Sequence, residues 1–304
     1  MVKKIFHLSG ENISVNQAYI MLALTVLLWA VGVVIARGVS DDVPLIGLSF
    51  WRWFAATLII VPLVYSDLRE KWDIVRENLG LLIIQGCLMV GSGTLLFFAM
   101  KYTTAINATI VNATQPVATV ALAWLILKER LKIIQWLGIV SAFIGIATMV
   151  SRADLSILSS LSFNIGDILI VIAIMGYATY SINVRKMPKG ISPFTALSII
   201  LISGSLLILP FYVYETVNVQ AFPLSPMTVF IVLVLAFLVS IVSIVMWNLA
   251  IHVVGPGRAG MFVNLIPVYG TALAILFLGE KLFFYHVIGA ALVCLGIFLV
   301  LRNH

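Results

Sequence analysis

The sequence has few charged residues and almost no cysteine. Of its 304 residues 10% are charged and 62% are hydrophobic, whereas about a quarter of an ordinary soluble domain is charged. Because even a large soluble domain needs polar residues at its surface, a water-soluble fold is excluded and lipid must surround most of the chain. Cys87 and Cys294 both fall in apolar stretches, where two inert buried thiols are the simpler interpretation.

The residues of catalysis, metal binding and ATP hydrolysis are also missing. The four histidines, His7, His252, His286 and His304, lack His-x-x-x-His spacing and companion carboxylates, so we expect no metal and no enzyme. The absence of a Walker lysine motif and of a Gly-rich phosphate loop argues against ATP-driven transport and a nucleotide cofactor. The net charge of +6 comes from residues in short polar breaks, as in membrane proteins, so nucleic-acid binding is discarded.

The chain contains instead a series of long apolar stretches. A membrane-spanning helix needs about 20 mostly apolar residues. The stretches that meet this test are ten: 18–36, 44–65, 79–100, 104–127, 133–150, 164–184, 193–214, 227–250, 259–278 and 283–301. They are continuously apolar rather than alternating, which excludes a barrel. The expected fold class is therefore an all-α integral membrane protein with ten transmembrane helices, and the first apolar run is too long for a signal peptide.

The basic residues between the stretches predict an orientation. When the loops are assigned alternately to the two sides of the membrane, those on one side contain Lys3, Lys4, Arg69, Lys71, Arg76, Lys128, Arg130, Lys132, Arg185, Lys186, Lys189, Arg258 and Arg302. The other side receives Arg37, Lys101, Arg152 and Lys281. Since Lys and Arg mark the cytoplasmic side, both termini are expected in the cytoplasm, with the protein in a bacterial inner membrane.

The chain contains an internal repeat. A shift of 151 residues aligns 99–150 with 250–301 without a gap. The matches include Ala108/Ala259, Pro116/Pro267, Ala121/Ala272, Glu129/Glu280, Leu131/Leu282, Gly138/Gly289 and Gly145/Gly296. We therefore expect two five-helix repeats, 1–150 and 151–304. Because five is odd, the second copy enters the membrane from the opposite side, an inverted topology that many alternating-access transporters share.

Several motifs carry a family resemblance. They are Trp29 with Arg37, Phe50-Trp51-Arg52, the segment from Pro116 to Leu127-Lys128-Glu129-Arg130-Leu131, and its copy from Pro267 to Leu278-Gly279-Glu280-Lys281-Leu282. On these residues the chain resembles the drug/metabolite transporter superfamily, specifically its EamA-like ten-helix members. The resemblance implies a monomer-sized bundle with a central cavity lined by helices one, three, four, six, eight and nine. It also implies an exporter of amino acids or other metabolites, with a small-molecule substrate and the lipid bilayer as partners.

Polar and aromatic side chains within the apolar stretches are the candidates for substrate binding, because such residues usually face the interior of a bundle. They are Trp29, Gln85, Met89, Ser92, Asn112, Gln115, Tyr177, Tyr180, Ser243, Trp247 and Asn264. A shift of 148 residues places Trp29 on Tyr177, so paired aromatics could face each other across the cavity. The alternatives are ordinary packing for the aromatics and interhelical hydrogen bonding for the amides.

Four residues are candidate hinges or gates. Pro116 and Pro267 each remove a backbone donor and bend a helix, either as hinges or only to give it shape. Glu129 and Glu280 end their helices beside basic residues and either latch a gate or form local ion pairs.

Two further charged residues lie in or near the spans. Arg52 needs a buried partner, either structural or a substrate carboxylate, and its counterpart in the second repeat is Leu201. Asp167 is the only acid in the predicted spans, which leaves proton antiport, exchange and facilitated diffusion all open.

The sequence as a whole predicts a secondary transporter for small organic solutes that works by alternating access. A cavity with amides, hydroxyls and aromatics and no central acid suits neutral or zwitterionic solutes better than polycations. The alternative is a receptor or a channel-like protein without active coupling.

Overall fold

The computed structural model describes residues 13–39, 42–99, 101–103, 108, 111–128, 132–159, 164–278 and 281–302. Within them every regular element is a helix, as the sequence predicts, and no strand occurs. The first part of the chain forms α2 (Val15–Gly38), α3 (Leu45–Glu70), α4 (Trp72–Glu77), α5 (Leu79–Ala99), α7 (Gln115–Leu127), α8 (Ile133–Val150) and α9 (Leu155–Ser159). The second part forms α10 (Ile165–Asn183), η2 (Val184–Lys186), α11 (Pro193–Asn218), α12 (Pro226–Val234), η3 (Leu235–Val242), α13 (Ser243–Val254), α14 (Pro256–Met261), η4 (Phe262–Asn264), α15 (Leu265–Leu278) and α16 (Phe284–Leu301).

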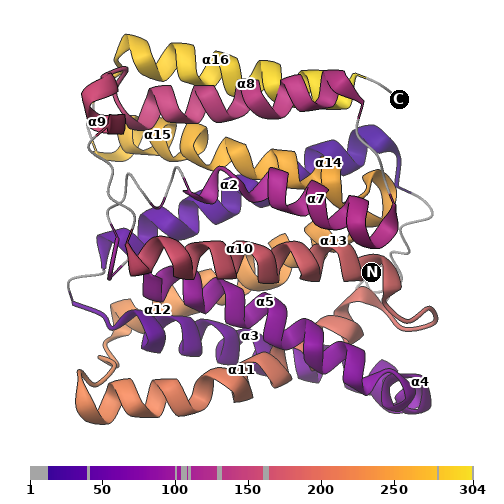
Figure 1. The fold of residues 1–304 in the computed structure, drawn as a ribbon. Helices are drawn as coiled ribbons and strands as arrows, with labels where there is room; N and C mark the ends of the chain where they lie inside the picture. Colours follow the sequence, from indigo (N-terminus) through magenta and orange to yellow (C-terminus); the bar gives the residue numbers. More distant parts are fainter. Residues whose placement is uncertain are drawn as a thin grey trace.

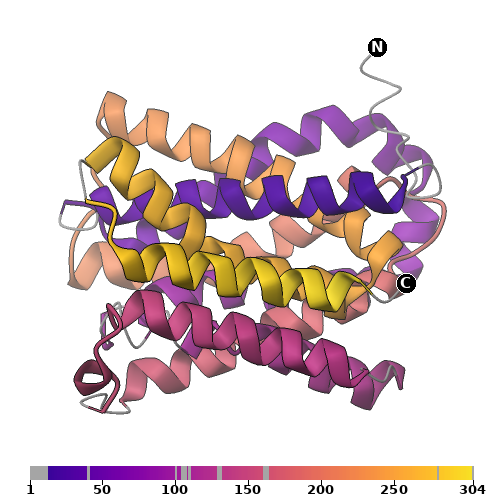
Figure 2. The same cartoon turned by 90° about the horizontal axis from the view of Figure 1, so that it is seen from above.

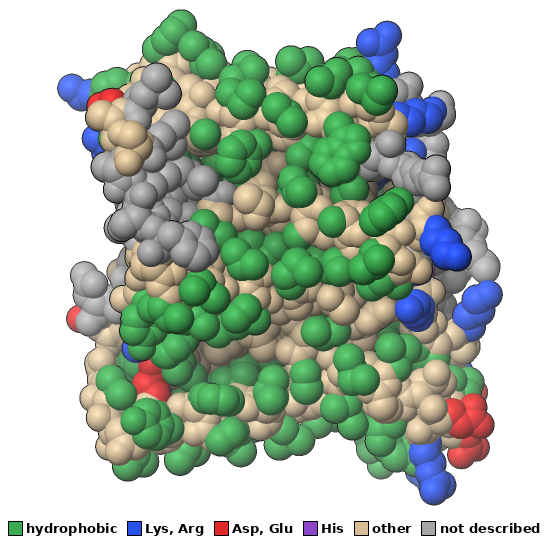
Figure 3. Space-filling view, in the orientation of Figure 1, with side chains coloured by type: hydrophobic (Ala, Val, Ile, Leu, Met, Phe, Trp, Pro, Cys, Tyr) green, Lys and Arg blue, Asp and Glu red, His purple; other side chains and the backbone are tan. Residues whose placement is uncertain are grey.

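The long helices lie beside one another along one direction, and their ends form two opposite faces of the bundle (Figures 1 and 2). Hydrophobic side chains cover the middle of the bundle in Figure 3, and Lys and Arg lie at its margins. Apolar side chains on this outer surface are widely exposed; Ile133, for example, is 80% exposed. Among the described residues, 8 helices are long and apolar enough to cross a membrane. The chain is therefore a multi-pass membrane protein.

Two of the ten predicted spans are divided into shorter helices, and a third, 227–250, contains the π-helical stretch η3 between α12 and α13. In place of 104–127 the described chain has a turn at 113–114 and then α7, and in place of 259–278 it has α14, the 3-10 turn η4 and α15. Each later helix restarts next to a proline: Pro116 is the second residue of α7, and Pro267 is the third residue of α15. Because proline lacks an N–H group, it is tolerated in a first helical turn and disfavoured in a helix interior. The sequence predicts that the two prolines bend continuous helices, whereas the structure places them in the first turns of shorter ones.

The contacts between helices are reciprocal in the two parts of the chain. α10 packs against α5 and α7, and α2 packs against α13 and α15. Likewise α11 packs against α5, and α3 packs against η3. The long helices of one part thus pack on helices of the other, and the interior of the bundle lies between the two parts.

The most extensive contact between described helices joins α8 to α16, which lie side by side in Figures 1 and 2. A Cβ atom added at Gly138 would lie 2.5 Å from the carbonyl oxygen of Gly296, and one at Gly145 would lie 2.6 Å from that of Gly289. Small residues allow such close backbone contact between membrane helices. We call this contact, formed by the four glycines, the α8–α16 seam.

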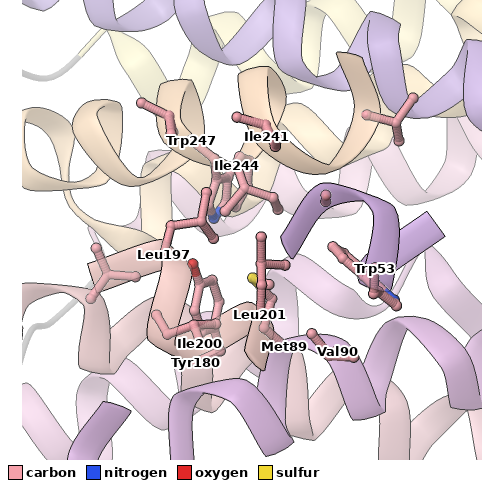
Figure 4. Close-up of a cluster of buried hydrophobic side chains, with 14 of the residues drawn as sticks. Trp53, Met89, Val90, Tyr180, Leu197, Ile200, Leu201, Ile241, Ile244 and Trp247 are labelled. Carbon is pink, nitrogen blue, oxygen red and sulfur yellow. The ribbon is translucent and has the colours of Figure 1, made fainter. Parts of the chain in front are cut away.

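Aromatic and branched side chains fill the core beside α11. Trp247, Tyr180, Leu197 and Leu201 are fully buried, and Figure 4 shows them pointing toward one another from α10, α11 and α13. The Tyr180 hydroxyl donates to Asn248 Oδ1 at 2.7 Å, which ties α10 to α13. Dense packing makes this region a rigid support for its surroundings.

A buried carboxylate joins α11 to the start of α3 at one face of the bundle. Glu215 is 2% exposed and accepts the backbone N–H of Gly47 at 2.7 Å. It also pairs with Lys101, with 3.5 Å between the charged atoms. A negative charge at a helix N-terminus is favourable because the unpaired N–H groups there carry partial positive charge. Glu215 therefore fixes this end of the bundle.

Candidate functional site

A cavity of about 140 Å³ lies inside the bundle. Its walls come from α2, α3, α5, α10, η3, α13, η4, α15, residue 112 and the start of α7. The lining residues are Trp29, Gly32, Val33, Arg52, Trp53, Met89, Ser92, Gly93, Leu96, Phe97, Asn112, Gln115, Ala173, Ile174, Tyr177, Val239, Ile244, Val263 and Ile266. At about 10–15 Å³ for each water-sized group, the cavity has room for roughly ten such groups, which is the size of a small metabolite.

Three interrupted helices meet at this cavity. Asn112 and Gln115 line it where α7 begins, and Val263 and Ile266 line it where η4 passes into α15. Val239 lines it from η3, a π-helical stretch between α12 and α13. Irregular backbone is tolerated at membrane depth only where protein or a cavity surrounds it, and π-helical turns are frequent at functional sites. The interruptions therefore make this cavity the candidate binding site.

Aromatic rings form one wall of the site. The Trp29 and Tyr177 ring centroids are 5.7 Å apart and the rings meet edge to face, so the two rings touch within one wall, whereas the sequence predicts that they face each other across the cavity. Trp247 lies behind them, 4.9 Å from Trp29 between centroids. Such a wall offers apolar area and ring faces to a flat or apolar solute.

Ser243 holds Trp29 in place. The Trp29 Nε1–H donates to Ser243 Oγ at 2.9 Å, and the Ser243 hydroxyl in turn donates to the Val239 carbonyl. The Thr25 hydroxyl donates to the Ser243 carbonyl at 3.2 Å. Because this serine is fully buried and uses its hydroxyl within the protein, it positions the aromatic wall without facing the cavity itself.

The structure divides the eleven predicted binding residues into two groups. The cavity wall includes Trp29, Met89, Ser92, Asn112, Gln115 and Tyr177. The surrounding core contains Gln85, Tyr180, Ser243, Trp247 and Asn264. The Gln85 amide donates to the Tyr180 carbonyl at 3.2 Å. This is an interhelical hydrogen bond, the alternative that the sequence leaves open for the buried amides. The core residues support the wall and do not line it.

None of the four candidate hinge or gate residues is among the described residues that line the cavity. Pro116 and Pro267 are adjacent to the lining residues Gln115 and Ile266, so they fix where each wall begins. Glu129 and Glu280 lie outside the described residues. Hinge or gate action by any of the four stays a prediction.

Three important wall residues were not among the predicted binding residues. Arg52, Trp53 and Phe97 all line the cavity, and the Arg52 guanidinium carbon lies 4.1 Å from the centroid of the Trp53 ring. The sequence did carry a signal, since Arg52 lies well within an apolar stretch, where an arginine is costly and usually functional.

Asp167 lies at the start of α10 and does not line the cavity. It is 1% exposed, and it accepts from the Thr103 hydroxyl at 2.6 Å and from the Asn164 backbone N–H at 3.0 Å. This is the geometry of a helix cap. Among the residues described, no group of three or more His, Cys, Asp or Glu could hold a metal ion.

Comparisons with known proteins agree with this architecture. The family model described as "EamA-like transporter family" matches residues 16–151 and again 164–302. "Uncharacterized transporter YyaM" of Bacillus subtilis is 28% identical over 251 residues, 81% of either chain. "Probable amino-acid metabolite efflux pump" of Salmonella typhimurium is 26% identical over 285 residues, 91% of this chain and 92% of that protein. A solved crystal structure shares the fold, with a TM-score of 0.76 at 15% identity over 94% of this chain and 97% of that chain.

Proposed function

Because the chain belongs to the EamA-like transporter family of the drug/metabolite transporter superfamily, we propose that it is a secondary transporter that carries small organic solutes by alternating access. The observation that carries the proposal is the cavity at the interruptions of α7, η3 and η4. Its size suits a metabolite, and its walls come from both parts of the chain. Transporters bind their solutes at such discontinuous helices, between two repeats.

We further propose that residues 1–150 and 151–304 are two five-helix repeats of opposite orientation, ten helices in all. Two separate matches to one family model support this division, and so do the reciprocal contacts of α2 and α10. The pairing of glycines in the α8–α16 seam also supports this division, because Gly138 lies opposite Gly296 while Gly145 lies opposite Gly289. Antiparallel pairing of equivalent helices is what an inverted repeat requires.

For the orientation, we propose that both termini face the cytoplasm of a bacterial inner membrane. In Figure 3 the Lys and Arg side chains gather mostly at the right-hand edge, where Figure 1 places α4. An excess of basic residues at one face marks the cytoplasmic side. Because the helices of a single bundle surround the cavity, we propose that a monomer is sufficient for transport.

For the solute, we propose amino acids or related metabolites, carried outward. The name of the Salmonella relative supports this class. The test is flux of a panel of radiolabelled amino acids and related metabolites in sealed proteoliposomes, with and without a pH gradient. We expect saturable flux, and the pH gradient shows whether protons drive it.

Two tryptophan variants make the test specific to the cavity. Trp29→Ala removes a wall of the cavity and is expected to lower flux roughly tenfold at low solute concentration, the equivalent of one aromatic contact. Trp136→Ala removes a ring that is 44% exposed on α8, outside the cavity lining, and is expected to leave flux unchanged. Equal losses in the two variants, or no saturable flux of any solute by folded protein, would contradict the proposal.

A further inference from the structure

Arg52 is the one charged side chain among the described residues that line the cavity. It is 7% exposed and lies within α3, a membrane-spanning helix. The ion pairs among the described residues are Asp67–Lys71 and Glu215–Lys101, so none neutralises this guanidinium. A charge at membrane depth costs free energy unless it is paired. Contact with the Trp53 ring at 4.1 Å and the Phe97 ring at 5.4 Å offsets part of this cost.

Buried polar atoms beside Arg52 also lack partners within the described chain. These are Arg52 Nε, Trp53 Nε1 and Tyr177 Oη, all on residues that line the cavity. The first two can only donate hydrogen bonds, and a tyrosine hydroxyl donates readily. Buried donors in folded proteins almost always have an acceptor, so a molecule that brings acceptor oxygens into the cavity would satisfy these three groups.

The cavity itself offers no negative charge. Its described lining contains no Asp or Glu, and its remaining polar side chains are Ser92, Asn112 and Gln115. The other wall residues are apolar or aromatic, apart from two glycines. A guanidinium presents parallel N–H groups that match a carboxylate in a bidentate pair. The site therefore fits a solute with a carboxylate at one end and an apolar body at the other.

We propose that Arg52 binds the carboxylate of the transported solute, and that the cavity selects monocarboxylates with an apolar or aromatic body whether or not they carry an ammonium group. The proposal rests on the transport function proposed above and narrows its substrate class. The asymmetry of the cavity orients the solute. The counterpart of Arg52 in the second part of the chain is Leu201, which is fully buried in the core (Figure 4). One end of the cavity then binds the charge, and the Trp29–Tyr177 wall receives the apolar body.

The competing explanation is that Arg52 only packs on Trp53. Packing would stabilise the protein without distinguishing an acid from its neutral amide, whereas a carboxylate site prefers the acid. The experiment therefore measures the ratio of two dissociation constants in detergent-purified full-length protein, for 3-phenylpropionate and for 3-phenylpropionamide. Phenethylamine and phenylalanine are measured alongside. The amide has the same shape without the charge, so its binding also reports whether a variant is folded.

We expect the unmodified protein to bind 3-phenylpropionate about 10- to 100-fold more tightly than the amide, the usual effect of a charged hydrogen-bonded pair. The dissociation constant of phenylalanine should be similar to that of 3-phenylpropionate, and phenethylamine should not bind. Arg52→Gln should abolish the preference by weakening acid binding alone, and Arg52→Lys should keep part of it. Arg76→Gln is the matched control, because it removes an equal charge from an exposed position on α4 and should leave the ratio unchanged.

The outcomes separate this proposal from the transport function. Retention of the acid preference in Arg52→Gln, or binding of phenethylamine with exclusion of the acid, overturns the role of Arg52. If proteoliposomes also carry the amine or the amide in a saturable way, the transport function stands and only the substrate class is wrong. If the folded protein carries no solute from either panel, both proposals fail.

Discussion

The α8–α16 seam and the cavity wall both contain glycine and serine, but these residues do different things in the two regions. In the seam, glycines let the backbones touch, and the Ser141 hydroxyl donates to the Leu292 carbonyl at 2.9 Å. In the wall, a Cβ atom added at Gly93 would lie 3.5 Å from the Trp53 side chain, and Ser92 makes no hydrogen bond among those described. In the seam, the serine hydroxyl bonds to the facing helix. In the wall, the Ser92 hydroxyl remains available to a ligand.

Helix continuity explains the contrast. α8 and α16 each run for 18 residues without interruption, so their backbone groups are satisfied within each helix and the two can pack over their full length. The helices at the cavity are interrupted at Gln115, at η3 and at η4. Since broken backbone is stable at membrane depth only beside protein or a cavity, the interruptions and the cavity depend on each other.

The largest expected effect comes from breaking the seam. Gly145→Ala places a methyl group 2.6 Å from the Gly289 carbonyl oxygen, so the helices must separate. We expect a loss of about 1–3 kcal/mol of stability, as for other overpacked contacts, measured as thermal unfolding in detergent.

The matched control for this variant is Gly270→Ala on α15, where the added methyl meets no described atom within 4 Å. Alanine there should be neutral or stabilise the protein by about 0.5–1 kcal/mol, because glycine is the poorer helix former. Equal losses in the two variants would show that the seam is not a tight contact.

A smaller effect comes from two tyrosines of α10. Tyr180→Phe removes the hydroxyl that donates to Asn248 at 2.7 Å and leaves a buried amide oxygen unpaired, so it should cost about 1–2 kcal/mol of stability. Tyr177→Phe removes a hydroxyl with no partner in the described chain and should leave stability within about 0.5 kcal/mol. Thermal unfolding and solute binding are measured for both variants.

The two tyrosines should therefore separate core from cavity. Tyr177→Phe is expected to weaken solute binding about threefold to tenfold, the value of one hydrogen bond, while Tyr180→Phe keeps the affinity. A loss of stability in Tyr177→Phe with unchanged binding would place that hydroxyl in the core.

Much of the fold follows from the sequence because lipid imposes a simple rule of apolar length. The predicted stretches 133–150 and 164–184 agree with α8 and α10 to within a residue. Family membership was also predictable from motifs such as Phe50-Trp51-Arg52.

The breaks in the helices were not predictable from hydropathy, because Asn112–Gln115 and Val263–Ile266 lie in runs that remain apolar on average. Pro116 and Pro267 indicated where these two breaks lie, but not that a new helix starts at each of them. The division of polar residues between wall and core was also hidden. Gln85 and Asn112 are both amides in apolar helices, and only the packing of neighbouring helices decides that Gln85 donates to the Tyr180 carbonyl while Asn112 lines the cavity.

The smallest expected effect compares a serine of the seam with a serine of the wall. Ser141→Ala removes the hydrogen bond to the Leu292 carbonyl and should cost about 0.5–1 kcal/mol of stability, the usual value between membrane helices, with solute flux unchanged. Ser92→Ala removes a hydroxyl from the cavity and should leave the unfolding temperature unchanged while flux at low solute concentration changes about two- to threefold. Both variants are measured by unfolding in detergent and by flux in proteoliposomes. If Ser92→Ala lost stability and kept flux, its hydroxyl would belong to the packing, and the boundary of the binding site would have to move toward Asn112 and Gln115.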